Sequence, residues 1–109
     1  MKTYTEFHGE IDISNIGKRL RLISKSEVCF KILTGYGASS YQSKSKQSAL
    51  NSLSKMKKEG IISGYLPGEI AYQVLGETSI YYDTLLRYIN IIKNDPDYGN
   101  DGVIFVFVK

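Results

Sequence analysis

The sequence VCFKILTGYGASS, residues 28–40, joins a run of strand-forming residues to a loop that holds two glycines. Residues 28–33 are apolar except for Lys31, a composition typical of a strand with both faces buried. Gly35 and Gly37 follow this run, and a helical pattern begins near Ser43. A strand, a glycine loop and a helix in this order are typical of α/β folds, which bind ligands beyond the carboxyl ends of their strands.

On either side of this stretch, apolar periodicity predicts helices between short strands. One helix follows the first predicted strand, with Ile13, Ile16, Leu20 and Ile23 on one stripe, and a second spans about 43–59. A third helix is predicted from residue 78 or 79 to about 93. The predicted strands are 4–8, 28–33, 61–66, 70–75 and 103–108. This order predicts an α/β fold, a two-layer α/β sandwich with a mixed, largely parallel sheet.

Length and composition exclude several classes of protein. The chain has 109 residues, 42% of them hydrophobic, which suits one domain (1–109) with a single core. No apolar run approaches the ~18–20 residues of a membrane span, and MKTYTEFHGE at the start lacks the apolar stretch of a signal peptide. A single cysteine, Cys29, excludes an internal disulfide framework. We therefore expect a cytoplasmic domain with no membrane segment.

Positive charge is concentrated in the first half of the chain. Residues 1–58 carry eleven Lys and Arg against four acids, whereas residues 59–109 carry three against seven. The net charge of the whole chain is +3. A basic half suits the phosphates of nucleic acid, while the acidic half keeps the domain soluble. The alternative is that the lysines only solvate the outer faces of helices.

Two short elements hold the residues best suited to chemistry. Gly35 and Gly37 permit close approach of the backbone to a ligand, and the N–H groups of the next helix bind anions. His8 ends the predicted strand 4–8, and histidine titrates near pH ~6.5, a range suited to acid–base catalysis. Glu6, two residues earlier, lies on the same side of that strand and can orient the imidazole. If the first two strands are parallel neighbours, both elements lie at one edge of the sheet.

These elements resemble a known family. TEFHG (5–9) resembles the LDLHG element that opens Smr domains, the small MutS-related family, with Glu6 in place of the family's Asp. ILTGYGASS (32–40) resembles the family's second element, and GYLPGE (64–69) and GNDGVIFVFVK (99–109) are similar to its later stretches. The resemblance covers residues 4–69 and 99–109. Residues 70–98, which hold the third predicted helix, form an insertion where the family passes almost directly to its last strand.

The resemblance implies a domain that binds RNA or DNA and, in some members, acts as an endonuclease. It also implies a fold like the C-terminal domain of translation initiation factor three. His8 and Glu6 then belong to the first functional element, as the catalytic residues. The residues of the nucleic-acid-binding element and its flank are Thr34, Gly35, Tyr36, Gly37, Lys44 and Lys46. In it the glycine N–H groups meet a phosphate, the two lysines neutralise its neighbours and Tyr36 stacks on an unpaired base.

Catalysis takes one of two forms on these residues. In the first, two of the acids Glu6, Glu10 and Asp12 hold a Mg²⁺ together with His8, because magnesium prefers oxygen ligands. In the second, His8 acts as acid or base without a metal on RNA, where the 2′-OH is the nucleophile. Both forms stay open at this point.

Two other functions are open to the same sequence. The tyrosine-rich helix 78–93 can serve a homodimer or a partner protein, which predicts an exposed apolar patch around Tyr81, Leu85 and Tyr88. A small phosphate-bearing molecule can also bind the loop of Gly35 and Gly37. Salt dependence of binding separates nucleic acid from the partner protein, because phosphate contacts weaken as salt rises.

Overall fold

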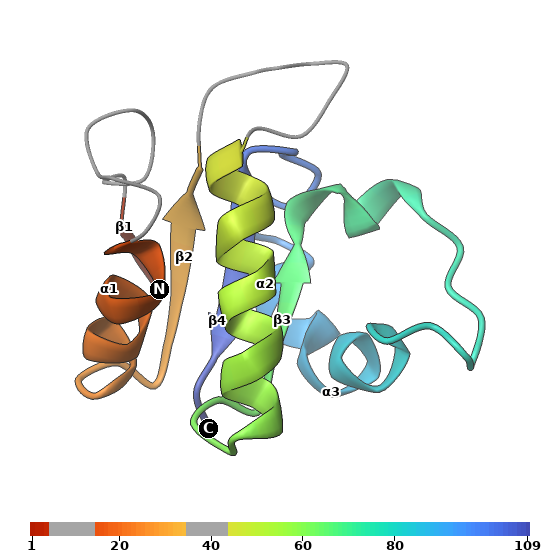
Figure 1. The fold of residues 1–109 in the computed structure, drawn as a ribbon. Coiled ribbons are helices and arrows are strands. Elements are labelled where there is room, and N and C mark those ends of the chain that lie inside the picture. The colour runs from red at the N-terminus through yellow and green to blue at the C-terminus, as the bar shows by residue number, and fades with distance from the viewer. Residues whose placement is uncertain (5–14, 35–43) are drawn as a thin grey trace.

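The computed structural model describes residues 1–4, 15–34 and 44–109, with the side chains of residues 44 and 45 left aside. The elements in chain order are β1 (Lys2–Tyr4), α1 (Ile16–Ser24), β2 (Cys29–Leu33), α2 (Lys44–Lys58), β3 (Gly64–Pro67), the 3-10 helix η2 (Gly68–Tyr72), α3 (Tyr82–Ile92) and β4 (Val103–Phe107). The strands form one sheet in the order β1-β2-β4-β3 (Figure 1).

The mixed sheet is confirmed, but the expectation that it is largely parallel is wrong for the described strands. β1 and β2 pair in parallel, whereas β4 runs antiparallel to both β2 and β3. The reason is that β4 enters the sheet at the edge where β2 ends. There the amide of Thr34 donates a hydrogen bond to the carbonyl of Gly102 over 2.7 Å, immediately before β4 begins.

The two-layer α/β sandwich is confirmed, with α1 and α2 side by side on one face of the sheet (Figure 1). Both helices bury the apolar sides that their periodicity predicts. The buried residues of this core come from α1 (Ile16, Leu20, Ile23), α2 (Ala49, Leu53, Met56), the strands (Phe30, Ile32, Tyr65, Ile104, Val106) and Ile62. Gly60, just beyond α2, has φ +78°, the left-handed conformation expected of a glycine that ends a helix.

The chain between β3 and β4 covers part of the other face of the sheet. Tyr88 of α3 stacks on Phe107 of β4 with 4.0 Å between ring centroids, and Ile70 of η2 is buried in the same cluster. The predicted strand 70–75 is wrong: the chain forms η2 and then leaves the sheet. The cause is that the carbonyl of Gly68 accepts a hydrogen bond from the Gly99 amide, which turns the backbone away from β4. Residues 70–98 therefore contribute Ile70, Tyr88 and Ile92 to a second core on this face.

Within the described ranges, no helix is both long enough and apolar enough to cross a bilayer. The longest of these helices, α2, has 15 residues and carries five lysines counting its first and last positions. The hydrophobic surface of α2 is a narrow stripe against the sheet, and its remaining circumference is polar.

Candidate functional site

The edge that the sequence predicts for the site lies where β1 and β2 both end. Their parallel pairing is confirmed, with Tyr4 opposite Ile32 and Thr34 just beyond β2. The first turn of α2 reaches the same edge, because Lys46 contacts the carbonyl of Asp101 immediately before β4. The two chain segments that hold the predicted elements are therefore anchored side by side.

Most of the predicted site residues lie outside the described part of the structure. These are Glu6 and His8 of the first element, Gly35, Tyr36 and Gly37 of the second, and the proposed magnesium ligands Glu10 and Asp12. The side chain of Lys44 is likewise not described. Among the residues that are described, no group of three or more His, Cys, Asp or Glu is placed to hold a metal ion.

Thr34 is the one member of the predicted glycine element that is described, and it is buried. Its exposed fraction is 1%. Its hydroxyl donates a hydrogen bond of 3.2 Å to the carbonyl of Gly102, which also accepts the Thr34 amide. Thr34 therefore joins the end of β2 to the start of β4, and its side chain makes a structural contact within the fold.

Lys46 is a second predicted contact to phosphate, and its side chain lies inside the fold. Its exposed fraction is 3%, and its Nζ contacts both carboxylate oxygens of Glu69, at 2.5 and 2.7 Å, and the carbonyl of Asp101 at 2.7 Å. A buried ammonium needs partners inside the protein, and Glu69 supplies the balancing negative charge here. Lys46 fastens α2 to η2 and to the loop before β4.

Lys31 forms a second buried ion pair that the sequence did not predict. Its Nζ lies 3.0 Å from Asp95 Oδ1 and 2.8 Å from Asp97 Oδ2, and its side chain is 8% exposed. Burial lowers the pKa of Lys31, but the hydrogen bonds and negative charges of Asp97 and Asp95 together raise it by more. The pKa of Lys31 is therefore raised above its ordinary value. The partners are more than 60 residues apart, which is why no local pattern indicates them.

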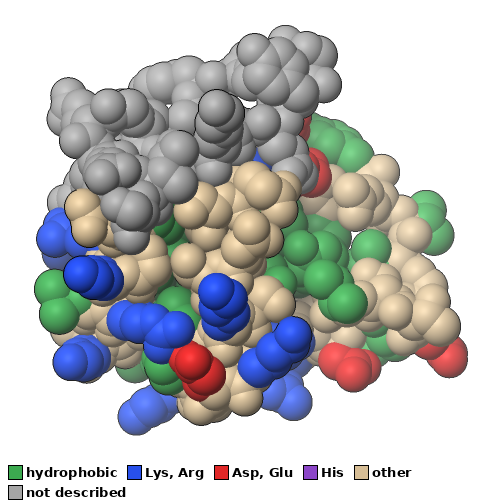
Figure 2. All heavy atoms as spheres, in the orientation of Figure 1, with side chains coloured by type: hydrophobic (Ala, Val, Ile, Leu, Met, Phe, Trp, Pro, Cys, Tyr) green, Lys and Arg blue, Asp and Glu red, His purple; other side chains and the backbone are tan. Residues whose placement is uncertain are grey.

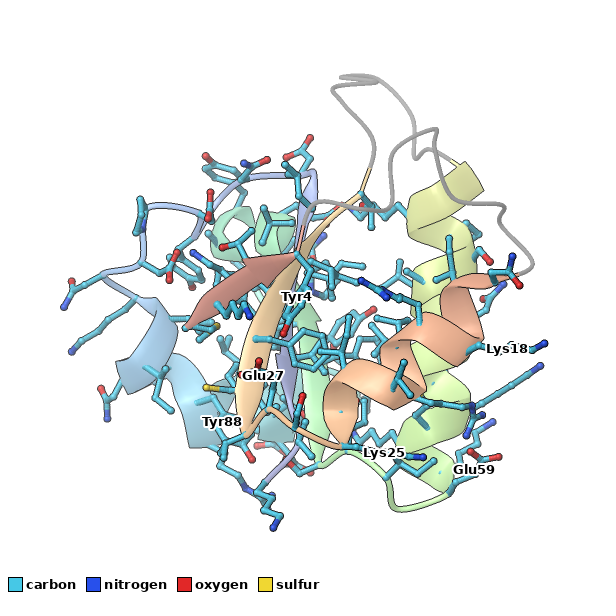
Figure 3. All side chains as sticks on the ribbon, turned by 90° about the vertical axis from the view of Figure 1, so that its left-hand side faces the viewer. Tyr4, Lys18, Lys25, Glu27, Glu59 and Tyr88 are labelled. Carbon is cyan, nitrogen blue, oxygen red and sulfur yellow. The ribbon has the colours of Figure 1, made fainter. Side chains whose placement is uncertain are left out.

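Exposed positive charge instead gathers on the outer side of the helical layer (Figure 2). We call this surface the basic face; its residues are Lys18, Arg21, Lys25, Lys55, Lys57 and Lys58. Lys18 points away from the sheet, on the side opposite Tyr88 (Figure 3). Glu59 pairs with Arg21 over 2.6 Å. Glu27 and Glu59 are the only acids between residues 13 and 68, so the surface keeps a strong positive charge.

A pocket of about 380 Å³ opens beside the basic face, between α2, β3 and the segment that leads into α3. We call it the tyrosine pocket; it is lined by Ser54, Lys57, Lys58, Tyr65, Ile80 and Tyr81. Hydrophobic side chains are visible in this hollow next to α2 (Figure 2). The rings of Tyr65 and Tyr81 meet edge to face, with centroids 5.7 Å apart. Burial, followed by the nearby charges and a hydrogen bond with Tyr65, raises the pKa of Tyr81 to about 12.

The apolar patch expected on the helix 78–93 is not present. Tyr81 and Leu85 are half-buried and Tyr88 is buried, all packed against the sheet. The cause is that Tyr81, just before α3, and the side of α3 that holds Leu85 and Tyr88 cover β3 and β4. The hydrophobic side chains that α3 exposes, Leu86 and Ile91, are separated by five positions and do not form one stripe. Single exposed hydrophobic residues of this kind are ordinary on a protein surface.

Comparison with protein-family models, with curated proteins and with solved structures gives no match to this chain. The resemblance to Smr domains therefore stays a prediction from its short motifs, and the function has to be argued from the geometry of the chain itself.

Proposed function

We propose that this domain binds nucleic acid and that the basic face is the surface that contacts the phosphates. The observation that supports this is the concentration of five exposed lysines and the half-buried Arg21, from α1, the residue after it and α2, on one side of the molecule. A cluster of this kind attracts a polyanion, and each phosphate that it neutralises releases counterions from the nucleic acid. The proposal retains the predicted ligand class and places most phosphate contacts on the helical layer.

The distribution of the other charges favours a specific surface over general solvation of helices. α3 carries both signs, with Asp83 near its start and Arg87 one turn later. Among the lysines whose side chains are described, the two that are buried, Lys31 and Lys46, already have carboxylate partners. Of the other described lysines of the first half, Lys2 lies on β1 and the remaining five belong to the basic face.

The second part of the proposal concerns the edge of the sheet where β1 and β2 end. The segments 5–14 and 35–43, which hold His8 and the glycine element, continue from this edge. Cleavage of a bound strand is proposed only as an activity of His8 and Glu6. It is tested by product formation with wild type and its loss in His8→Ala, with binding measured in parallel.

The binding proposal is tested with two matched double variants. Lys25→Ala/Lys55→Ala removes two exposed charges from the basic face, and Arg87→Ala/Lys93→Ala removes two from the other side of the molecule. Affinity for labelled single- and double-stranded RNA and DNA is measured at low salt. We expect the first variant to bind about tenfold more weakly and the second to bind as wild type does. Equal losses in both variants, or no binding by wild type, would contradict the proposal.

A further inference from the structure

The tyrosine pocket combines two kinds of surface in one small space. Tyr65, Tyr81 and Ile80 line it with aromatic and aliphatic groups, while Lys57 and Lys58, two exposed cationic residues, line it from α2. Its volume of about 380 Å³ is at the lower end of those that hold small organic ligands. A ligand that fits this lining has a flat apolar body with a negative group attached to it.

We infer that this pocket receives one unpaired base of a bound single strand, with the adjoining phosphate at Lys57 and Lys58. A nucleobase is a flat ring that gains by contact with aromatic side chains, and a strand carries a phosphate beside every base. The inference rests on the proposed function, because it makes the pocket part of the same nucleic-acid surface.

Continuity with the basic face is the second support for this occupant. Lys57 and Lys58 belong to both surfaces, and both face solvent at the end of α2. A backbone that follows the basic face therefore reaches the mouth of the pocket without leaving positive charge. A paired base cannot enter, because it is stacked and hydrogen-bonded inside the duplex, so the pocket makes the domain prefer single strands.

The pocket offers a residue that can be changed with little effect on the fold. Ile80 lines the pocket, yet 68% of it is exposed, so a polar side chain is tolerated there. Val74, in the same segment between η2 and α3, is fully exposed and is not among the residues that line the pocket. Ile80→Asp and Val74→Asp therefore make the same chemical change inside and outside the pocket.

The experiment compares two strands of equal length and charge. One carries bases and the other is an abasic backbone, so phosphate contacts are the same and only base contacts differ. We expect wild type and Val74→Asp to bind the base-bearing strand about tenfold more tightly than the abasic strand. In Ile80→Asp this ratio should fall to near one. Because each ratio is taken within one variant, the added charge cancels.

Three results would overturn the inference, and each can be told from failure of the proposed function. Equal, salt-sensitive binding of both strands by wild type rejects the base pocket and leaves the basic face. A tenfold ratio that survives Ile80→Asp places the base elsewhere on the molecule. If neither strand binds while adenosine monophosphate binds wild type and not Ile80→Asp, the pocket serves a free nucleotide and both proposals fail as stated.

Discussion

Lys46 shows how burial alone changes what a lysine does in this domain. Lys46 and Lys55 are both on α2, nine positions apart, but one is almost fully buried and the other is exposed. The buried ammonium is held by Glu69, whereas the exposed one lies on the basic face. The first therefore makes contacts inside the fold, whereas the second is free to meet a ligand under the proposed function.

This difference gives a prediction at the residue scale. Lys46→Ala leaves Glu69 without its buried partner and should lower the free energy of unfolding by about 3 kcal/mol. Lys55→Ala should change it by less than about 0.5 kcal/mol. Urea denaturation of both variants measures the two values. Equal stabilities of Lys46→Ala and wild type would contradict the structural role given to Lys46.

Gly68 gives a second prediction, because the fold leaves no room for a side chain there. A Cβ on Gly68 would lie 2.1 Å from the carbonyl oxygen of Asn100, which is a backbone atom and cannot move aside cheaply. Gly68→Ala should therefore cost about 3 kcal/mol of stability. Gly76→Ala is the control, since its Cβ meets nothing within 4 Å. A Gly68→Ala protein as stable as this control would refute the close contact.

At the scale of elements, apolar periodicity predicted correctly the buried sides of the helices that pack against one face of the sheet. Leu20 of α1 and Leu53 of α2 are fully buried, as their spacing predicts. The strand predicted over residues 70–75 is wrong because a short apolar run does not distinguish a strand from a 3-10 helix. Gly68 decides that question through its hydrogen bond with Gly99, a contact about thirty residues away that no local pattern contains.

The packing of the segment before α3 predicts a loss of stability at alkaline pH. The pKa of Tyr81 is raised from 10.0 to about 12, so the folded state disfavours its charged form. Stability from this group is complete below pH 10.0 and declines as pH rises through about 12. The pKa of Lys31 is also raised above 10.5, so its contribution declines over the alkaline range as well.

Tyr81→Phe isolates the tyrosine part of this dependence, because phenylalanine keeps the ring and has no ionisable group. The free energy of unfolding of both proteins is measured from pH 9 to about 12. We expect the stability of wild type to fall more steeply than that of Tyr81→Phe above pH ~10. Parallel curves would show that Tyr81 ionises equally in the folded and unfolded states.

At the scale of the whole molecule, the positive charge of the first half of the sequence divides into an internal and an external part. Part of it is internal, since Lys31 and Lys46 pair with Asp95, Asp97 and Glu69 from the second half of the chain. Much of the rest is external and lies on the basic face. The sequence predicted the imbalance from counts alone, but only the fold separates the lysines that join the halves from those that meet solvent.

The candidate site was accessible to sequence reasoning only in part. The parallel ends of β1 and β2, which anchor the two predicted elements, follow from strand and helix patterns. The tyrosine pocket does not, because Tyr65 and Tyr81 come from segments 16 residues apart and meet only after η2 turns the chain. The contact between Tyr65 and Tyr81 carries no sequence signal.

The salt dependence of single-strand binding tests the central claim most directly. If Lys25 and Lys55 each neutralise a phosphate, removing both should reduce the slope of log affinity against log salt by about 1.4. Arg87→Ala/Lys93→Ala should leave that slope unchanged. A slope that is the same in wild type and Lys25→Ala/Lys55→Ala, or affinity that does not respond to salt, would contradict a phosphate-binding basic face.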